Sequence, residues 1–120
     1  YISDIVDGII LAVKNPAKKN KKWNPRKPDP SSSIYPFKIY NIGSNKRTNL
    51  IKYLKLLEKF LERKARINYL PLQKGDVVDV FSKTDNIKKE LKYKPKVDVE
   101  EGVKNFVKWF KYYYKVKWVI

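Results

Sequence analysis

The chain has 120 residues, 42% of them hydrophobic and 33% charged, which is typical of one small globular domain with a modest core. It contains no Cys and no His, which excludes disulfides, thiolate nucleophiles, Cys-based metal sites and the commonest general base. The absence of Cys fits a cytoplasmic location, and no apolar run of the sequence is long enough to span a bilayer.

The formal net charge is +16, from 28 Lys and Arg against 12 Asp and Glu. This balance raises the question of a nucleic-acid or anionic-membrane partner. Arginine, whose planar side chain suits phosphate and base recognition, is rare here, and the lysines are scattered over nearly every predicted element. We therefore interpret the lysines mainly as a solvated surface and disfavour nucleic acid as a partner. A small lysine-rich module binding nucleic acid or an anionic membrane remains the alternative function.

The first predicted element is a helix at residues 3–14, with Ser3 or Asp4 as its N-cap. Its broad apolar stripe is expected to need a packing partner. Gly8 interrupts this helix at a cost in stability unless another backbone comes close to it. Residues 15–36 follow as a long loop rich in Pro, Asn, Lys and Ser, which is typical of a mobile lid, a binding loop or a linker.

Residues 37–114 are predicted to form a strand–helix–strand–helix–helix core, within a single region that covers residues 1–120. Alternating side chains favour strands at 37–42 and 66–70 and a brief extended stretch at 77–81. Helical periodicity favours helices at 49–63, from Thr84 or Asp85 to near Tyr93, and at 99–114. Thr48 is the expected cap of the helix at 49–63, and Asp98 that of the last helix, where Glu101 completes a variant of the capping box. The predicted fold class is therefore α/β, with helices and a few short strands.

Several short segments resemble motifs of one family, in the family's order and over nearly the whole chain. Tyr1–Val6 (YISDIV), Tyr40–Gly43 (YNIG), Gln73–Val77 (QKGDV) and Tyr93–Pro95 with the helix that follows are similar to motifs of extended short-chain dehydrogenase/reductase epimerases. The loop segments Trp23-Asn24 and PDPSSS, together with the LPLQ that ends at Gln73, resemble the UDP-glucuronate 4-epimerase subgroup.

The resemblance implies the C-terminal, substrate-binding portion of an NAD-dependent nucleotide-sugar epimerase/dehydratase. In that family an N-terminal Rossmann half holds NAD and carries the catalytic Ser/Thr and Tyr-x-x-x-Lys, while the C-terminal portion grips the UDP-sugar. The chain starts at Tyr1, without Met and directly before a helix signal, which suggests that it was cut from a longer protein. We expect the Rossmann half to be missing and the chain to bind no cofactor and perform no catalysis alone. The family also implies a cytoplasmic, homodimeric parent in polysaccharide biosynthesis.

The motifs of the catalytic half are not found in this sequence. Its four glycines are far apart, whereas a dinucleotide-binding turn needs clustered glycines. Tyr113 and Lys117 do form a Tyr-x-x-x-Lys, but after the closing helix motif, at the wrong end of the family's order. We interpret this pair as a chance match, and we assign no catalytic residue and no metal ligand.

Three residues are the candidates for substrate binding. Asp76 follows Gly75 in the segment similar to the family's substrate loop, where the resemblance implies a bond to the nucleotide ribose or to a neighbouring loop; an ordinary Gly-Asp turn is the alternative. Gln73 stands where related epimerases often place an Arg against the diphosphate, so it either marks the subgroup or weakens nucleotide binding. Asn41, at a predicted strand end, is expected to reach the ligand or to cap the turn at Gly43.

Overall fold

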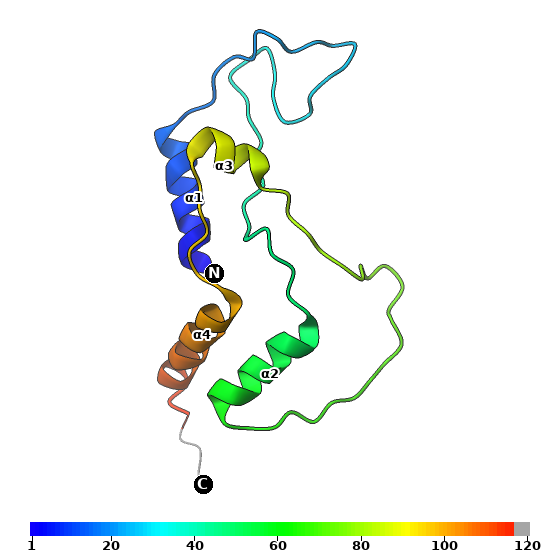
Figure 1. Ribbon diagram of the computed structural model, residues 1–120, viewed down its shortest axis with the longest axis vertical. Helices are drawn as coiled ribbons and strands as arrows, with labels where there is room; N and C mark the ends of the chain where they lie inside the picture. The colour runs from blue at the N-terminus through cyan, green and yellow to red at the C-terminus, as the bar shows by residue number, and fades with distance from the viewer. Residues whose placement is uncertain (117–120) are drawn as a thin grey trace. The chain divides into compact units, whose positions relative to one another are not determined.

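The computed structural model describes residues 1–116, in which four helices form the regular secondary structure (Figure 1). They are α1 (Ile2–Lys14), α2 (Leu50–Leu61), α3 (Asp85–Leu91) and α4 (Val99–Tyr113). The sequence predicted each of them to within about two residues, the usual uncertainty of helix ends. No helix among the described residues has the length and apolarity that a membrane crossing requires.

The strands predicted at 37–42 and 66–70 do not form. Within residues 1–116 the β-pairing is limited to two isolated bridges, Asn24 with Lys27 and Ser32 with Lys38. The α/β prediction is therefore wrong in its strands, and the described chain is helical with almost no β-structure. Alternating side chains give a tendency to extend, but a strand forms only where a neighbouring strand pairs its backbone. Segment 66–70 has no such neighbour in the described chain, and Tyr69 in it is 79% exposed.

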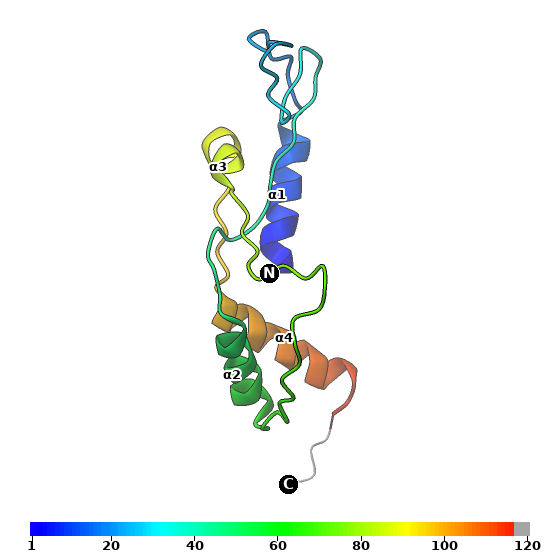
Figure 2. The same ribbon diagram turned by 90° about the vertical axis from the view of Figure 1, so that its right-hand side faces the viewer.

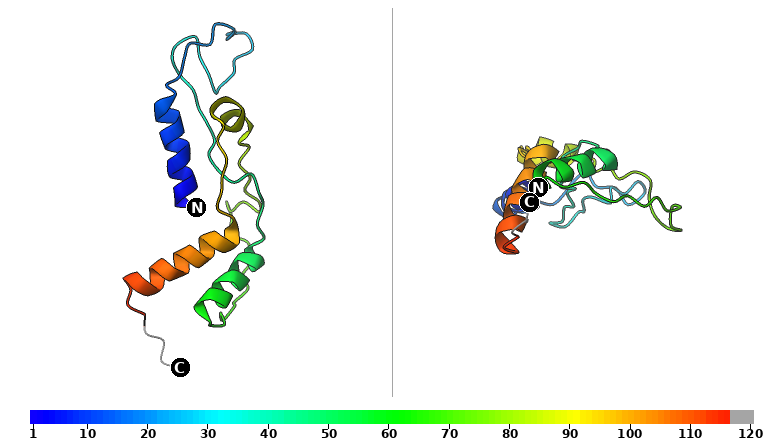
Figure 3. Two further views of the ribbon diagram at one scale, coloured as in Figure 1. Left: turned by 60° about the vertical axis from the view of Figure 1, so that its left-hand side comes forward. Right: turned by 90° about the horizontal axis from the view of Figure 1, so that it is seen from below.

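The structure divides into two compact units, of which the first comprises Tyr1, residues 46–81 and the described residues from 97 onward. In this unit α2 lies beside α4, as Figures 2 and 3 show. Leu56 of α2 and Val103 and Val107 of α4 are buried between the two helices. Lys111 reinforces the contact, because its Nζ donates to the Phe60 carbonyl oxygen in the last turn of α2 (2.9 Å).

The ends of α2 and α4 show how local sequence sets helix boundaries. Asp98 caps α4 as predicted, and its Oδ1 accepts from the backbone N–H of Glu101 (2.9 Å). The prediction of Thr48 as the cap of α2 is wrong: Asn49 is the N-cap, and its Oδ1 accepts from the backbone N–H of Ile51 (2.8 Å). Asn is the stronger capping residue of the two, and it directly precedes the first helical residue.

The second unit comprises residues 2–45 and 82–96. Its core holds Ile87, Leu91 and Tyr93, all nearly inaccessible to solvent, and α1 contributes Leu11 and Ala12 to their surroundings. The opposite face of α1 stays exposed, as expected for an apolar stripe that lacks a partner; it presents Val6, Ile9, Ile10 and Val13. This unit is therefore built from two helices, α1 and α3, and loop segments around a small apolar centre.

Gly8 lies where α1 comes closest to the segment that follows the long loop. A Cβ at this position would lie 3.0 Å from Ile42 Cδ1 and 3.4 Å from the Tyr93 ring. Side chains, and not another backbone, therefore come close to α1 at Gly8.

Replacing Gly8 with Val is expected to lower the free energy of unfolding by about 1–3 kcal/mol, because the added methyl groups must displace Ile42 or Tyr93. Gly102→Ala is the control, because a Cβ there meets ordinary van der Waals contacts at 3.5 Å and beyond. It is expected to raise stability by up to about 1 kcal/mol through helix propensity. Urea unfolding of both variants measures the difference, and equal stability of the two would contradict the packing described for Gly8.

Candidate functional site

The candidate substrate loop is a tight turn over residues Gln73 to Asp76. The backbone N–H of Asp76 donates to the Gln73 carbonyl oxygen (3.1 Å), and Gly75 between them has a φ of 96°. A positive φ at the third turn position favours glycine, and nothing lies within 4 Å of where its Cβ would be. Backbone conformation, rather than lack of space, therefore requires glycine here.

The turn presents its side chains to solvent. Gln73, Lys74 and Asp76 are all exposed, and the Asp76 carboxylate has no hydrogen-bond or ion-pair partner among residues 1–116. An exposed carboxylate can accept from two hydroxyl groups, and the Lys74 ammonium in the same turn supplies a positive charge. This arrangement can bind a polar, anionic ligand that carries vicinal hydroxyls.

Arg47, which precedes α2, contacts the segment that follows the turn. The guanidinium Nη1 lies 3.1 Å from Asp79 Oδ2, and the group sits 5.2 Å from the centroid of the Phe81 ring. Both charged side chains are more than half exposed, so the ion pair adds little to stability. Sequence reasoning missed Arg47, because no local pattern indicates a contact between segments so far apart in the chain.

Asn41 lies in the second unit, whereas Gln73 and Asp76 lie in the first. The Asn41 Nδ2 donates to the Lys83 carbonyl oxygen (3.3 Å), so its amide links two loop segments of its own unit. The same two segments approach closely at Gly43, where a Cβ would lie 3.0 Å from Ser82 Cβ. Of the three predicted site residues, the structure therefore brings together Gln73 and Asp76.

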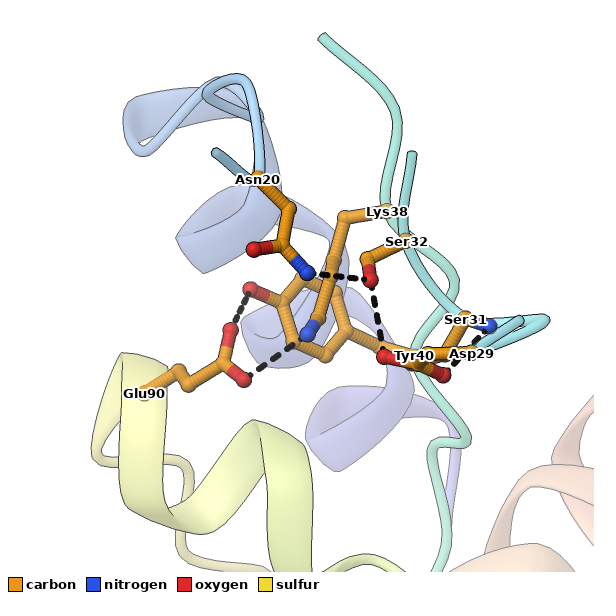
Figure 4. Close-up of polar contacts among 7 residues, drawn as sticks. All are labelled: Asn20, Asp29, Ser31, Ser32, Lys38, Tyr40 and Glu90. Carbon is orange, nitrogen blue, oxygen red and sulfur yellow. Dashed lines mark hydrogen bonds and ion pairs between the residues drawn. The ribbon is translucent and has the colours of Figure 1, made fainter. Parts of the chain in front are cut away.

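Glu90 of α3 gathers two side chains of the segment that follows the long loop, Lys38 and Tyr40 (Figure 4). One carboxylate oxygen accepts from the Tyr40 hydroxyl (2.7 Å), and the other lies 2.9 Å from Lys38 Nζ. Burial opposes ionisation of Glu90, but the Tyr40 hydrogen bond and the Lys38 charge outweigh it, so the pKa of Glu90 lies below its usual value. Burial, then the bond to the Glu90 carboxylate, raises the pKa of Tyr40 to about 12.

Tyr40→Phe tests this contact through its pH dependence. The folded pKa of Tyr40, about 12, is above the ordinary value of 10.0, so its stabilisation is complete below pH 10 and is lost as pH rises through 12. We expect Phe to cost about 1 kcal/mol of unfolding free energy at neutral pH, and less as pH rises. Urea unfolding of both proteins from neutral pH to about pH 11 measures this. A difference that grows with pH would contradict the contact.

The long loop at 15–36 is tied together by polar side chains, several of them drawn in Figure 4. Asp29 Oδ1 accepts from the backbone N–H and the hydroxyl of Ser31 (2.9 and 2.8 Å), and Oδ2 accepts from the Ser32 hydroxyl (2.7 Å). The Ser32 hydroxyl in turn accepts from Asn20 Nδ2 (3.0 Å), which joins the outgoing limb of the loop to the returning one. The Ser32 and Ser31 hydrogen bonds lower the pKa of Asp29.

Asp29→Ala is expected to loosen this loop, because three hydrogen bonds lose their common acceptor. Trypsin should then cut after the basic residues of 18–26 at least about fivefold faster, because cleavage follows local opening. Asp85→Ala, which removes a carboxylate outside the loop, should leave the cutting rate unchanged. Mass spectrometry of the digest locates the cuts, and equal rates in the wild type and Asp29→Ala would show that Asp29 does not hold the loop.

Sequence comparison relates the chain to known proteins along nearly its full length. It is 41% identical over 115 residues to protein CapI of Staphylococcus aureus, covering 96% of this chain and 34% of CapI. It is 34% identical to a probable UDP-glucuronate 4-epimerase of Rhizobium meliloti (96% of this chain, 34% of the relative) and 37% identical to UDP-glucuronate 4-epimerase 5 of Arabidopsis thaliana (95% and 25%). No family model matches the chain.

Two of these relatives are named as UDP-glucuronate 4-epimerases, which are nucleotide-sugar enzymes. More particularly, the chain belongs to the UDP-glucuronate 4-epimerase-like family, and it corresponds to the C-terminal part of these proteins, which confirms the resemblance seen in its motifs. It spans about a quarter to a third of the length of the relatives that it matches.

Proposed function

We propose that the chain is the UDP-sugar-binding portion of a nucleotide-sugar 4-epimerase of the UDP-glucuronate to UDP-galacturonate type, and that it catalyses no epimerisation alone. The observation that carries this proposal is the alignment of UDP-glucuronate 4-epimerases with 95–96% of the chain. The exposed Gln73–Asp76 turn supports it, because the turn offers an unpartnered carboxylate within that alignment.

The turn supplies the chemistry that a UDP moiety requires. The Asp76 carboxylate is suited to accept from the ribose hydroxyls, because charge-assisted hydrogen bonds are about twice as strong as neutral ones. Lys74 provides the positive charge that the diphosphate needs, and the neutral Gln73 donates from its amide. In this proposal Asn41 contributes as a support of its own unit, through its bond to Lys83, rather than through the ligand.

The family implies NAD as the redox cofactor, but the glycines of this chain do not fit it. Gly8 and Gly102 lie inside helices, Gly43 packs against Ser82, and Gly75 stands alone in an exposed turn. A dinucleotide site needs glycines that together let the backbone approach the pyrophosphate. NAD and the redox step are therefore assigned to a separate Rossmann portion, which we propose as the functional partner of this chain.

The Tyr113–Lys117 pair is no substitute for the catalytic pair of that portion. The Tyr113 ring stacks on Trp109 with centroids 5.2 Å apart and meets Tyr114 edge-on, which is packing between aromatic side chains. Lys117 lies outside the described residues.

We propose that the assembled enzyme is a cytoplasmic homodimer that supplies an acidic sugar nucleotide for polysaccharide biosynthesis.

A fusion with a relative tests this function. The C-terminal part of the Rhizobium meliloti protein is replaced by this chain, and conversion of UDP-glucuronate is followed with NAD present. The fusion should epimerise the sugar, whereas the chain alone should not. Turnover by the chain alone would overturn the proposal. So would a folded fusion that shows neither UDP-glucuronate binding nor turnover.

A further inference from the structure

The long loop carries a dense group of cations that are not paired within the described chain. Six basic residues fall between positions 18 and 27, and Asp29 is the one acidic residue of the whole loop at 15–36. All six are exposed, and none makes an ion pair within residues 1–116: Lys18, Lys19, Lys21, Lys22, Arg26 and Lys27. The single carboxylate of the loop, that of Asp29, accepts hydrogen bonds from Ser31 and Ser32. It therefore neutralises little of the positive charge of these six residues.

The loop presents these cations on an ordered scaffold. Two asparagine side chains stabilise turns of its backbone. Asn20 Oδ1 accepts from the backbone N–H of Lys22 (3.0 Å), and Asn24 Oδ1 accepts from the backbone N–H of Arg26 (2.9 Å). Trp23 fixes the same stretch, because its Nε1 donates to the Asp29 carbonyl oxygen (3.3 Å). Within its unit the loop extends past the C-terminal end of α1, as both Figures 1 and 2 show. The loop that carries the cations therefore lies at one end of this unit.

Exposed apolar residues follow on the returning limb of the loop. Ile34 is 47% and Tyr35 67% exposed. The Asn20 backbone N–H donates to the Ser33 carbonyl oxygen (2.8 Å), so these residues begin directly beside the basic limb. A surface of lysines next to an exposed Ile and Tyr matches the boundary of an anionic bilayer, where phosphates meet acyl chains.

We propose that residues 18–35 dock on an anionic phospholipid surface. Lysine is a compact, hydrated point charge suited to diffuse attraction by lipid headgroups, and five of the six cations are lysines. Single-stranded nucleic acid is the less fitting partner, because base stacking needs free aromatic faces. Tyr35 offers one such face, whereas Ile34 offers none and Trp23 is partly buried and bonded to Asp29, so the surface cannot stack a run of successive bases.

Vesicle binding by the full chain tests the proposal with two variants of equal net charge. The loop variant carries Gln at Lys18, Lys19, Lys21 and Lys22; the control carries Gln at four exposed helix lysines, Lys52, Lys55, Lys104 and Lys108. Each basic residue at an anionic bilayer strengthens binding by roughly fivefold. The four substitutions together correspond to roughly six-hundredfold, and two of them to roughly thirtyfold. Binding to phosphatidylserine-containing vesicles at low salt should therefore fall by at least about thirtyfold in the loop variant, and by less than about threefold in the control.

A third variant, Ile34→Ser with Tyr35→Ser, keeps every charge and should weaken vesicle binding by roughly tenfold while leaving binding to a single-stranded oligonucleotide unchanged. Circular dichroism establishes that the variants retain their helices. Three results would overturn the proposal: no binding of the wild type to anionic vesicles, equal losses in the loop and control variants, or loop-dependent binding that is tighter for the oligonucleotide than for the vesicles.

Discussion

Asp76→Asn is expected to weaken binding of UDP-glucuronate by the chain about tenfold or more. The carboxylate is exposed and has no partner among the described residues, so its hydrogen-bonding capacity is available to a ligand. A hydrogen bond to a charged group contributes about 1.5–3 kcal/mol, which corresponds to roughly ten- to hundredfold in affinity. Asn keeps the size of the side chain but removes its charge and replaces one acceptor oxygen with an NH2 donor.

Isothermal titration of the wild type and the variant with UDP-glucuronate measures this loss. Asp79→Asn is the matched control, because it makes the same chemical change a few residues along the segment. Asp79 already pairs with Arg47 at the surface, so this control should change affinity less than about twofold. Equal losses in both variants would mean that total charge, rather than Asp76, governs binding.

Ile87→Ala is expected to produce the largest loss of stability, about 2–5 kcal/mol of unfolding free energy. Ile87 is fully buried at the centre of the second unit, where Leu91 and Tyr93 surround it. Removing its methyl groups leaves a cavity that a few neighbouring segments can only partly close. Because the core is small, this single change should unfold much of the unit.

Val13→Ala is the control, because Val13 belongs to the same unit and is 75% exposed. Its substitution should change the unfolding free energy by less than about 0.5 kcal/mol. Urea unfolding followed by circular dichroism measures both variants. A small loss for Ile87→Ala would show that the apolar centre described for this unit does not stabilise it.

The helices could be predicted from the sequence because their signals are local. Periodic apolar residues fixed α1, α2 and α4, and Asp98 marked the start of α4 correctly. The predicted cap of α2, Thr48, is one residue before the observed cap, Asn49, because both residue types can cap a helix. The strands could not be predicted, because strand formation depends on a neighbouring strand and not on the pattern of one segment.

In the candidate site too, local features could be predicted from the sequence and contacts between distant segments could not. The turn at Gln73–Asp76 could be predicted, because glycine before an acidic residue is a local turn signal. The contacts of Arg47 with Asp79 and of Glu90 with Tyr40 could not, because each joins distant segments that only the folded chain brings together. The order of the loop at 15–36 was likewise hidden, since its hydrogen bonds run between two limbs of irregular backbone.

The most direct test of UDP-sugar binding is a titration of the isotope-labelled chain with UDP-glucuronate, followed through its backbone amide NMR signals. We predict that the signals of residues 73–76 shift with saturation, and that Asp76→Asn largely abolishes these shifts while the rest of the spectrum is preserved. An unchanged spectrum at saturating UDP-glucuronate, or shifts that leave residues 73–76 unaffected, would contradict the assignment of this chain as the UDP-sugar-binding portion of an epimerase.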